Sequence, residues 1–132
     1  MVCTTIAVCA CSAEKQINDF TQLESVYDEL QDYNKFELLD YSDDKMTLRY
    51  VDGITEELEN DVCPQTKNIL CSAEIKYIFK QKDDIYFVIA GVADNYYGYI
   101  LSQDTQVEME NITTVQRLFR PCKYKVFYFT AQ

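Results

Sequence analysis

The sequence predicts an α+β domain in which one long N-terminal helix packs on a curved antiparallel sheet of about five to six strands. Three observations favour this class. The chain has 132 residues, which is typical of a single domain. One amphipathic segment near the start precedes a series of short segments in which apolar and polar residues alternate. The 11 tyrosines and 7 phenylalanines are residue types that strands favour.

The long helix is predicted over residues 14–32. Ser12 would be its N-cap, and Glu14 would lie in the first turn, where a carboxylate complements the helix dipole. Apolar residues then recur at spacings of three and four and form a single stripe. The members of this stripe are Ile17, Phe20, Leu23, Tyr27 and Leu30.

A hairpin and a second, short helix are predicted next. Residues 36–41 and 46–50 form the two strands, and Ser42, Asp43 and Asp44 provide the turn between them. Residues 55–62 contain several glutamates and Leu58, which favour a short helix that Pro64 would end.

The second half of the chain predicts most of the sheet. Residues 85–93 are almost wholly apolar and should form a central strand that is covered on both faces. Gly98 indicates a bulge or a close approach of two backbones. A short helical turn is predicted at residues 115–119. The other strands are predicted at residues 75–80, 96–101, 107–112 and 123–130.

The charge is strongly uneven along the chain. Residues 1–61 hold 15 acids and 4 bases, whereas residues 62–132 hold 7 acids and 8 bases. An acidic domain repels phosphates, so we expect no nucleic acid partner and no contact with anionic lipid headgroups. The charge either attracts a basic protein, such as a toxin domain, or only keeps the chain soluble.

No catalytic residues, metal site or cofactor are predicted. The chain contains no histidine, which excludes the Ser-His-Asp and Cys-His arrangements of many hydrolases. It also contains no phosphate-binding or dinucleotide-binding glycine loop. Neighbouring carboxylates such as Asp83 and Asp84 fall in predicted turns, where aspartate is favoured for backbone reasons. We therefore expect a protein that is not an enzyme.

Residues 1–13 carry no charged side chain, and two interpretations of them remain open. Val8-Cys9-Ala10-Cys11 resembles the lipobox of a bacterial lipoprotein signal, which implies lipidation of Cys11 and a location on the periplasmic side of the envelope. The alternative is an N-terminal strand over residues 4–9 in a cytoplasmic protein. In either case residues 14–132 form one α+β domain. An oxidising envelope would favour a disulfide between Cys63 and Cys71, which flank a short segment.

The segment of residues 93–100 is the most distinctive in the second half, since it combines a turn with three tyrosines. Tyrosine is common in binding hot spots, but the same pattern suits a hairpin with cross-strand tyrosine pairs. Together with the aromatic strand at 123–130, it resembles small bacterial envelope lipoproteins and toxin-immunity proteins. That resemblance implies a protein-binding function. The candidate partner-binding residues are Asp94, Asn95, Tyr96, Tyr97 and Tyr99, with Asp28, Glu29, Asp43 and Asp44 from the acidic half.

Three functions are weighed. The first is an immunity protein that neutralises a bacterial toxin by occlusion. The second is an accessory or structural envelope lipoprotein that has no toxin partner. The third is a cysteine or carboxylate hydrolase, which the lack of an evident general base disfavours.

Overall fold

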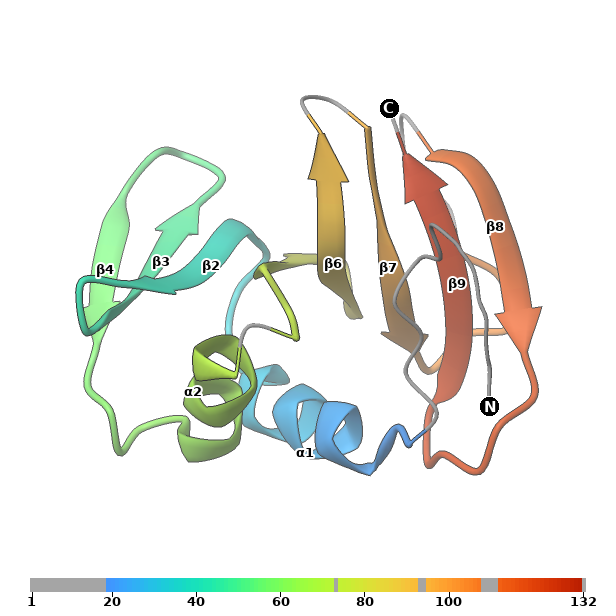
Figure 1. Ribbon diagram of the computed structural model, residues 1–132, viewed down its shortest axis with the longest axis horizontal. Helices are drawn as coiled ribbons and strands as arrows, with labels where there is room; N and C mark the ends of the chain where they lie inside the picture. Colours follow the sequence, from blue (N-terminus) through green and yellow to red (C-terminus); the bar gives the residue numbers. More distant parts are fainter. Residues whose placement is uncertain (1–18, 73, 93–94, 108–111, 132) are drawn as a thin grey trace, which may run out of the picture.

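The computed structural model describes residues 19–131 except for residues 73, 93–94 and 108–111 (Figure 1). This part of the chain has the predicted α+β class, with two helices and one open antiparallel sheet of eight strands. The helices are α1 (Thr21–Leu30) and α2 (Pro64–Cys71). The strands are β2 (Phe36–Ser42), β3 (Lys45–Tyr50), β4 (Thr55–Leu58), β5 (Tyr77–Gln81), β6 (Asp84–Val92), β7 (Asn95–Ser102), β8 (Ile112–Leu118) and β9 (Lys125–Ala131).

The sheet is assembled from two meanders and one hairpin, in the spatial order β4-β3-β2-β5-β6-β7-β9-β8. The first meander is β2–β3–β4, and α2 connects it to the second meander, β5–β6–β7. As a result β2 pairs with β5, which joins the two meanders into one sheet. After β7 the chain forms β8 at the edge of the sheet. It then returns as β9, which lies between β7 and β8. The β4 and β8 edges therefore lie at opposite ends of the molecule (Figure 1).

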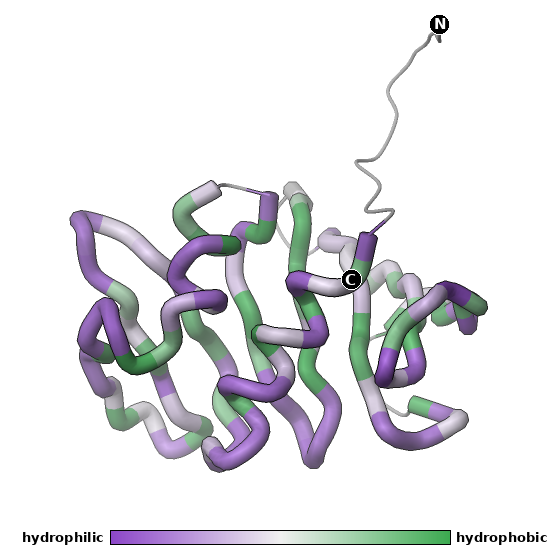
Figure 2. Tube along the Cα trace, turned by 90° about the horizontal axis from the view of Figure 1, so that it is seen from below, coloured by the Kyte–Doolittle hydropathy of each residue, from purple (hydrophilic) through white to green (hydrophobic). Residues whose placement is uncertain are grey.

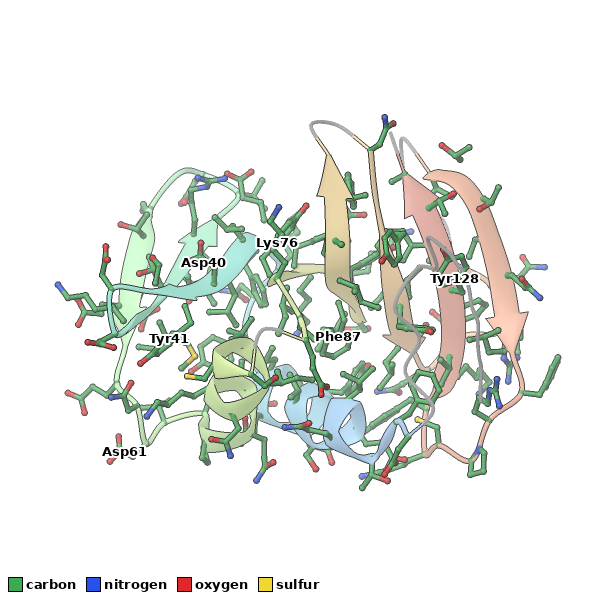
Figure 3. All side chains as sticks on the ribbon, in the orientation of Figure 1. Asp40, Tyr41, Asp61, Lys76, Phe87 and Tyr128 are labelled. Atoms are coloured by element: carbon green, nitrogen blue, oxygen red, sulfur yellow. The ribbon has the colours of Figure 1, made fainter. Side chains whose placement is uncertain are left out.

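Both helices cover one face of the sheet. The predicted apolar stripe is confirmed for α1, because its members Leu23, Tyr27 and Leu30 are all buried in the core. Phe87 extends from β6 into the same core (Figure 3). Apolar residues are concentrated along the middle strands of the sheet (Figure 2). Burial of this apolar surface is the main stabilising contribution to the fold.

A second apolar cluster lies on the opposite face of the sheet. Phe79 and Tyr86 stack there with ring centroids 4.5 Å apart, and Phe129 packs edge-on against Tyr86. Val107, from the connection between β7 and β8, packs against this cluster. The prediction that residues 85–93 form a central strand covered on both faces is confirmed for the described part of β6.

The predicted single long helix and the five to six strands are wrong. The helix α1 has 10 residues and begins at Thr21, whose backbone N–H donates to Asp19 Oδ1 over 2.9 Å. The proposed N-cap Ser12 and the apolar Ile17 lie outside the described residues.

Two predicted helical segments are strands. Residues 55–58 form β4 because all four pair with β3, and a helix over the eight residues 55–62 would be too short to be stable without tertiary support. Pro64 begins α2 rather than ending a helix, since the first helical position needs no backbone N–H. Residues 115–118 belong to β8, in which threonine and valine favour a strand.

Candidate functional site

The first meander carries an unusual concentration of negative charge. We call residues 36–62, which comprise β2, β3, β4 and the loop that follows, the acidic wing. It contains nine acids and two bases. Both bases are already paired, since Arg49 Nε lies 2.8 Å from Glu37 Oε1 and Lys45 Nζ lies 3.9 Å from Glu57 Oε1. The other acids are Asp40, Asp43, Asp44, Asp52, Glu56, Glu59 and Asp61, of which Figure 3 labels Asp40 on β2 and Asp61 on the loop before α2.

The turn between β3 and β4, within the acidic wing, carries two exposed aliphatic side chains. Val51 is 56% exposed and Ile54 is 63% exposed. Backbone hydrogen bonds fix this turn: Tyr50 N–H donates to the Ile54 carbonyl over 2.8 Å, and Gly53 N–H donates to the Tyr50 carbonyl over 2.9 Å. Asp52 accepts from Ile54 N–H, which adds a carboxylate beside the two aliphatic side chains. The turn is thus a preformed apolar tip with acidic surroundings.

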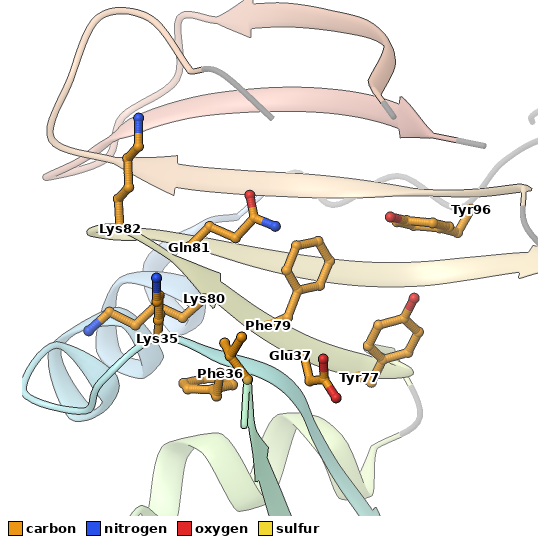
Figure 4. A pocket seen from close by; sticks show the side chains of 10 residues that line it. Lys35, Phe36, Glu37, Tyr77, Phe79, Lys80, Gln81, Lys82 and Tyr96 are labelled. Carbon is orange, nitrogen blue, oxygen red and sulfur yellow. The ribbon is translucent and has the colours of Figure 1, made fainter. Parts of the chain in front are cut away.

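A hollow of about 520 Å³ borders this tip on the face opposite the helices (Figure 4). Lys35 and Lys82 lie at one end of it and the rings of Tyr77 and Tyr96 at the other. Val51 also lines the hollow and so connects it to the tip of the acidic wing. Burial raises the pKa of Tyr77 and of Tyr96, so both phenols are neutral hydrogen-bond donors at neutral pH.

Two of the described thiols, those of Cys63 and Cys122, are poorly suited to nucleophilic catalysis. Burial raises the pKa of Cys63 and that of Cys122, which disfavours the reactive thiolate. No group of three or more metal-ligating side chains occurs within the described ranges. No described helix is long and apolar enough to cross a membrane.

A buried carboxyl lies at the start of β6, on the same face as the hollow. Asp84 Oδ1 accepts from Ser102 Oγ over 2.5 Å, and both residues are buried. Burial raises the pKa of the Asp84 carboxyl above its ordinary value of 3.8, and the hydrogen bond from Ser102 opposes this shift. The hydroxyl of Tyr86 is buried nearby in sequence without a described hydrogen-bond partner.

We expect the Asp84→Asn variant to be more stable than the wild type at pH 7. The raised pKa means that the folded state holds the proton more tightly than the unfolded chain, so stability falls as pH rises from 3.8 through the folded pKa. Asparagine keeps an oxygen for Ser102 and carries no charge. Urea unfolding at pH 7 and below pH 3.8 tests this, with Asp61→Asn as an exposed control away from Asp84. A gain in stability at pH 7 that disappears in acid is expected.

The structure places the predicted acidic residues in different settings. Asp43 and Asp44 form the exposed hairpin turn of the acidic wing, with φ values of 53° and 62°. Asp28 on α1 is exposed, and its carboxylate binds Lys123 at 3.3 Å and Tyr124 Oη.

Glu29 accepts hydrogen bonds from the backbone N–H groups of Gln65 and Thr66 and from Thr66 Oγ1, at 2.8 to 2.9 Å. Glu29 therefore stabilises the start of α2.

The tyrosines of the predicted binding segment lie on a strand, which confirms the strand predicted at residues 96–101. Tyr96, Tyr97 and Tyr99 belong to β7, which pairs with β6 and β9 in the interior of the sheet. Their side chains alternate between the two faces, and Tyr99 is buried. Asn95 is exposed at the start of the strand, and Asp94 lies outside the described residues. The structure thus has cross-strand tyrosine pairs, such as Tyr99 with Tyr128 on β9, at a ring distance of 5.8 Å.

The predicted disulfide between Cys63 and Cys71 is not formed, and both residues are free thiols. They flank α2 at its two ends, and a helix of 8 residues separates its ends by roughly 12 Å. That separation is too large for a disulfide, whose Cα atoms lie within about 7 Å. Cys11, the predicted lipidation site, lies outside the described residues.

The sequence prediction missed the apolar tip and the hollow. The tip was detectable in part, because Asp52-Gly53 between two aliphatic residues is a turn signal with exposed apolar flanks. The hollow was not detectable from the sequence, because it depends on the pairing of β2 with β5.

Comparison of the chain with protein-family models, with curated proteins and with solved structures gives no match.

Proposed function

We propose that this chain is a non-enzymatic protein-binding domain, and specifically an immunity protein that neutralises a bacterial toxin by covering a basic surface of it. The acidic wing is the observation that carries this proposal. Nine acids and two bases leave a net charge of −7 within 27 residues, and the two bases are paired within the wing. The negative electrostatic potential of so many carboxylates steers a basic partner toward this end of the molecule.

The apolar tip favours the interpretation that the acidic wing is a binding surface over the alternative that its charge only keeps the chain soluble. Val51 and Ile54 expose aliphatic side chains that water solvates poorly, and Asp52 and Glu56 lie beside them. An apolar centre with a polar rim is the usual composition of a protein interface. The hydrogen bonds of the turn fix this surface in advance, which lowers the entropic cost of association.

Occlusion requires no chemistry from the chain. The acidic wing would dock on the cationic substrate-binding surface of the toxin, and the tip would contact an apolar patch within it. The attraction between exposed charges is screened by salt, with a Debye length of about 8 Å at physiological ionic strength. We therefore expect the association rate to fall steeply as salt increases.

The Glu59→Lys, Asp61→Lys double variant should lose protection. Both side chains are exposed, and neither takes part in a described ion pair, so the fold should be retained. The test is survival of a susceptible strain that expresses the chain beside toxin-producing kin. Reversing two charges should reduce survival by about tenfold or more. The matched control is the Glu74→Lys, Asp104→Lys variant, which makes the same charge change outside the wing.

Lack of protection by the wild-type chain would contradict the immunity proposal. The accessory envelope lipoprotein is then favoured, and labelling of Cys11 with a radioactive fatty acid would test it. Equal loss of protection in both double variants would contradict only the role of the acidic wing, and not the immunity function. It would indicate that the overall charge of the chain decides protection.

A further inference from the structure

The two edges of the sheet are not equivalent. The strand β4 is only four residues long and carries Glu56 and Glu57, and short, charged edge strands resist pairing with other chains. The strand β8 is seven residues long and contains no acid, glycine or proline. It pairs with β9, and no other described strand pairs with it. Its outer backbone groups thus form the less protected edge.

The side chains at the β8 edge are also unusually exposed. Val115 is 42% exposed, and Phe119, directly after the strand, is 84% exposed. No other large apolar side chain among those described is as exposed as Phe119. Apolar side chains beside an open strand edge are typical of sites where an extended segment adds a further strand.

The charge at this end of the sheet is opposite to that of the acidic wing. Residues 112–132 contain four bases and no acid. The guanidinium of Arg117 lies over the rings of Phe119 and Phe127, with its central carbon 4.7 Å and 5.7 Å from the ring centroids. Its Nε is buried without a hydrogen-bond partner in the described part of the chain. The other bases are Arg120, Lys123 and Lys125.

We propose that the free edge of β8 binds an extended acidic segment of a partner protein by addition of a β-strand. Backbone hydrogen bonds to β8 would supply affinity, and an apolar side chain of the added strand would lie against Val115. A carboxylate two residues further along would lie beside Arg117, since alternate residues of a strand share one face. This site is separate from the acidic wing, because β4 and β8 are opposite edges of the sheet (Figure 1).

The charge favours an acidic partner over a second copy of this chain. Pairing of two β8 edges would bring together two ends that each carry four bases and no acid. Like charges placed close together oppose association, whereas carboxylates on the added strand would neutralise Arg117 and Arg120.

The experiment is a titration of the full chain, labelled with ¹⁵N, with a capped eight-residue peptide in which glutamate alternates with valine. At about 1 mM peptide we expect shifted amide resonances in residues 112–118 and none in residues 55–58. Two control peptides carry lysine in place of glutamate, or N-methyl groups on alternate amides, and neither should bind. The Arg117→Glu, Arg120→Glu variant should weaken binding by about tenfold or more, whereas Lys45→Glu on β3 should leave it unchanged.

Several outcomes would overturn the proposal. Equal binding of the N-methylated peptide to the wild-type chain would exclude strand addition without any need for a variant. Shifts confined to the hollow or to β4, or no shifts at all, would place the peptide elsewhere or nowhere. Dimerisation of the chain that Val115→Lys abolishes would identify a second copy as the occupant of the edge. None of these results bears on protection through the acidic wing.

Discussion

Replacing Gly98 with alanine should destabilise the protein by about 3–5 kcal/mol, which is a large part of the stability of a small domain. Gly98 on β7 lies opposite Val88 on β6, next to a register shift between Val88 and Ala90. A Cβ atom at this position would lie 1.8 Å from the Phe87 carbonyl oxygen and 2.9 Å from its carbon. Those are backbone atoms of a central strand, so the clash cannot be relieved by rotation of a side chain.

Urea unfolding, followed by tyrosine fluorescence because the chain has no tryptophan, would measure this loss. The matched control is Gly53→Ala. Gly53 has a φ of 89° but no atom within 4 Å of the new Cβ, so only backbone strain of about 1 kcal/mol is expected. A loss at Gly98 no larger than that at Gly53 would contradict the close approach of the two strands.

Lys80→Met should lower the free energy of unfolding by about 3 kcal/mol. Lys80 is buried, and its Nζ donates to the carbonyls of Leu30, Gln31 and Tyr33 at 3.1, 2.7 and 2.6 Å. These carbonyls end α1, which has no basic residue in its last turn. The ammonium group therefore satisfies the end of the helix and complements its dipole from a strand 50 residues away.

The comparison for Lys80 is Lys82→Met, which removes an exposed ammonium two residues away and should change stability by less than about 0.5 kcal/mol. Loss of protection from hydrogen exchange at the end of α1 in Lys80→Met would show that the effect is local to the cap. Equal stability of the two variants would contradict this role of Lys80.

Local patterns predicted much of the sheet and the packing face of the helix. The apolar run of β6 predicted a central strand, and Gly98 predicted the close approach that the register shift and the Cβ distance to Phe87 confirm. The stripe through Leu23 and Leu30 predicted the buried side of α1. These predictions were correct because each depends on the periodicity of a few neighbouring residues.

The wrong predictions concern segments whose structure depends on distant partners. Residues 55–58 have good helix formers but form a strand, because β3 offers them a ladder of hydrogen bonds. Val115 and Leu118 fit a helical spacing by chance, while their pairing with β9 sets the strand. Glu29 was assigned to partner binding, and only the packing of α1 on α2 shows that it caps α2. The acidic wing was predictable as charge and its tip in part as a turn, whereas the hollow was not, because it depends on the pairing of β2 with β5.

The insertion of β9 between β7 and β8 has a consequence for biosynthesis. The strand β8 leaves the ribosome before β9, yet its described neighbour in the sheet is β9 alone. The outer edge of β7 stays open over the same interval, since β9 also fills that position. A nascent chain that has reached residue 118 therefore exposes two unsatisfied strands of high β-propensity at once. We expect stalled or truncated chains of that length to need a chaperone, and chains that include β9 to be released from it.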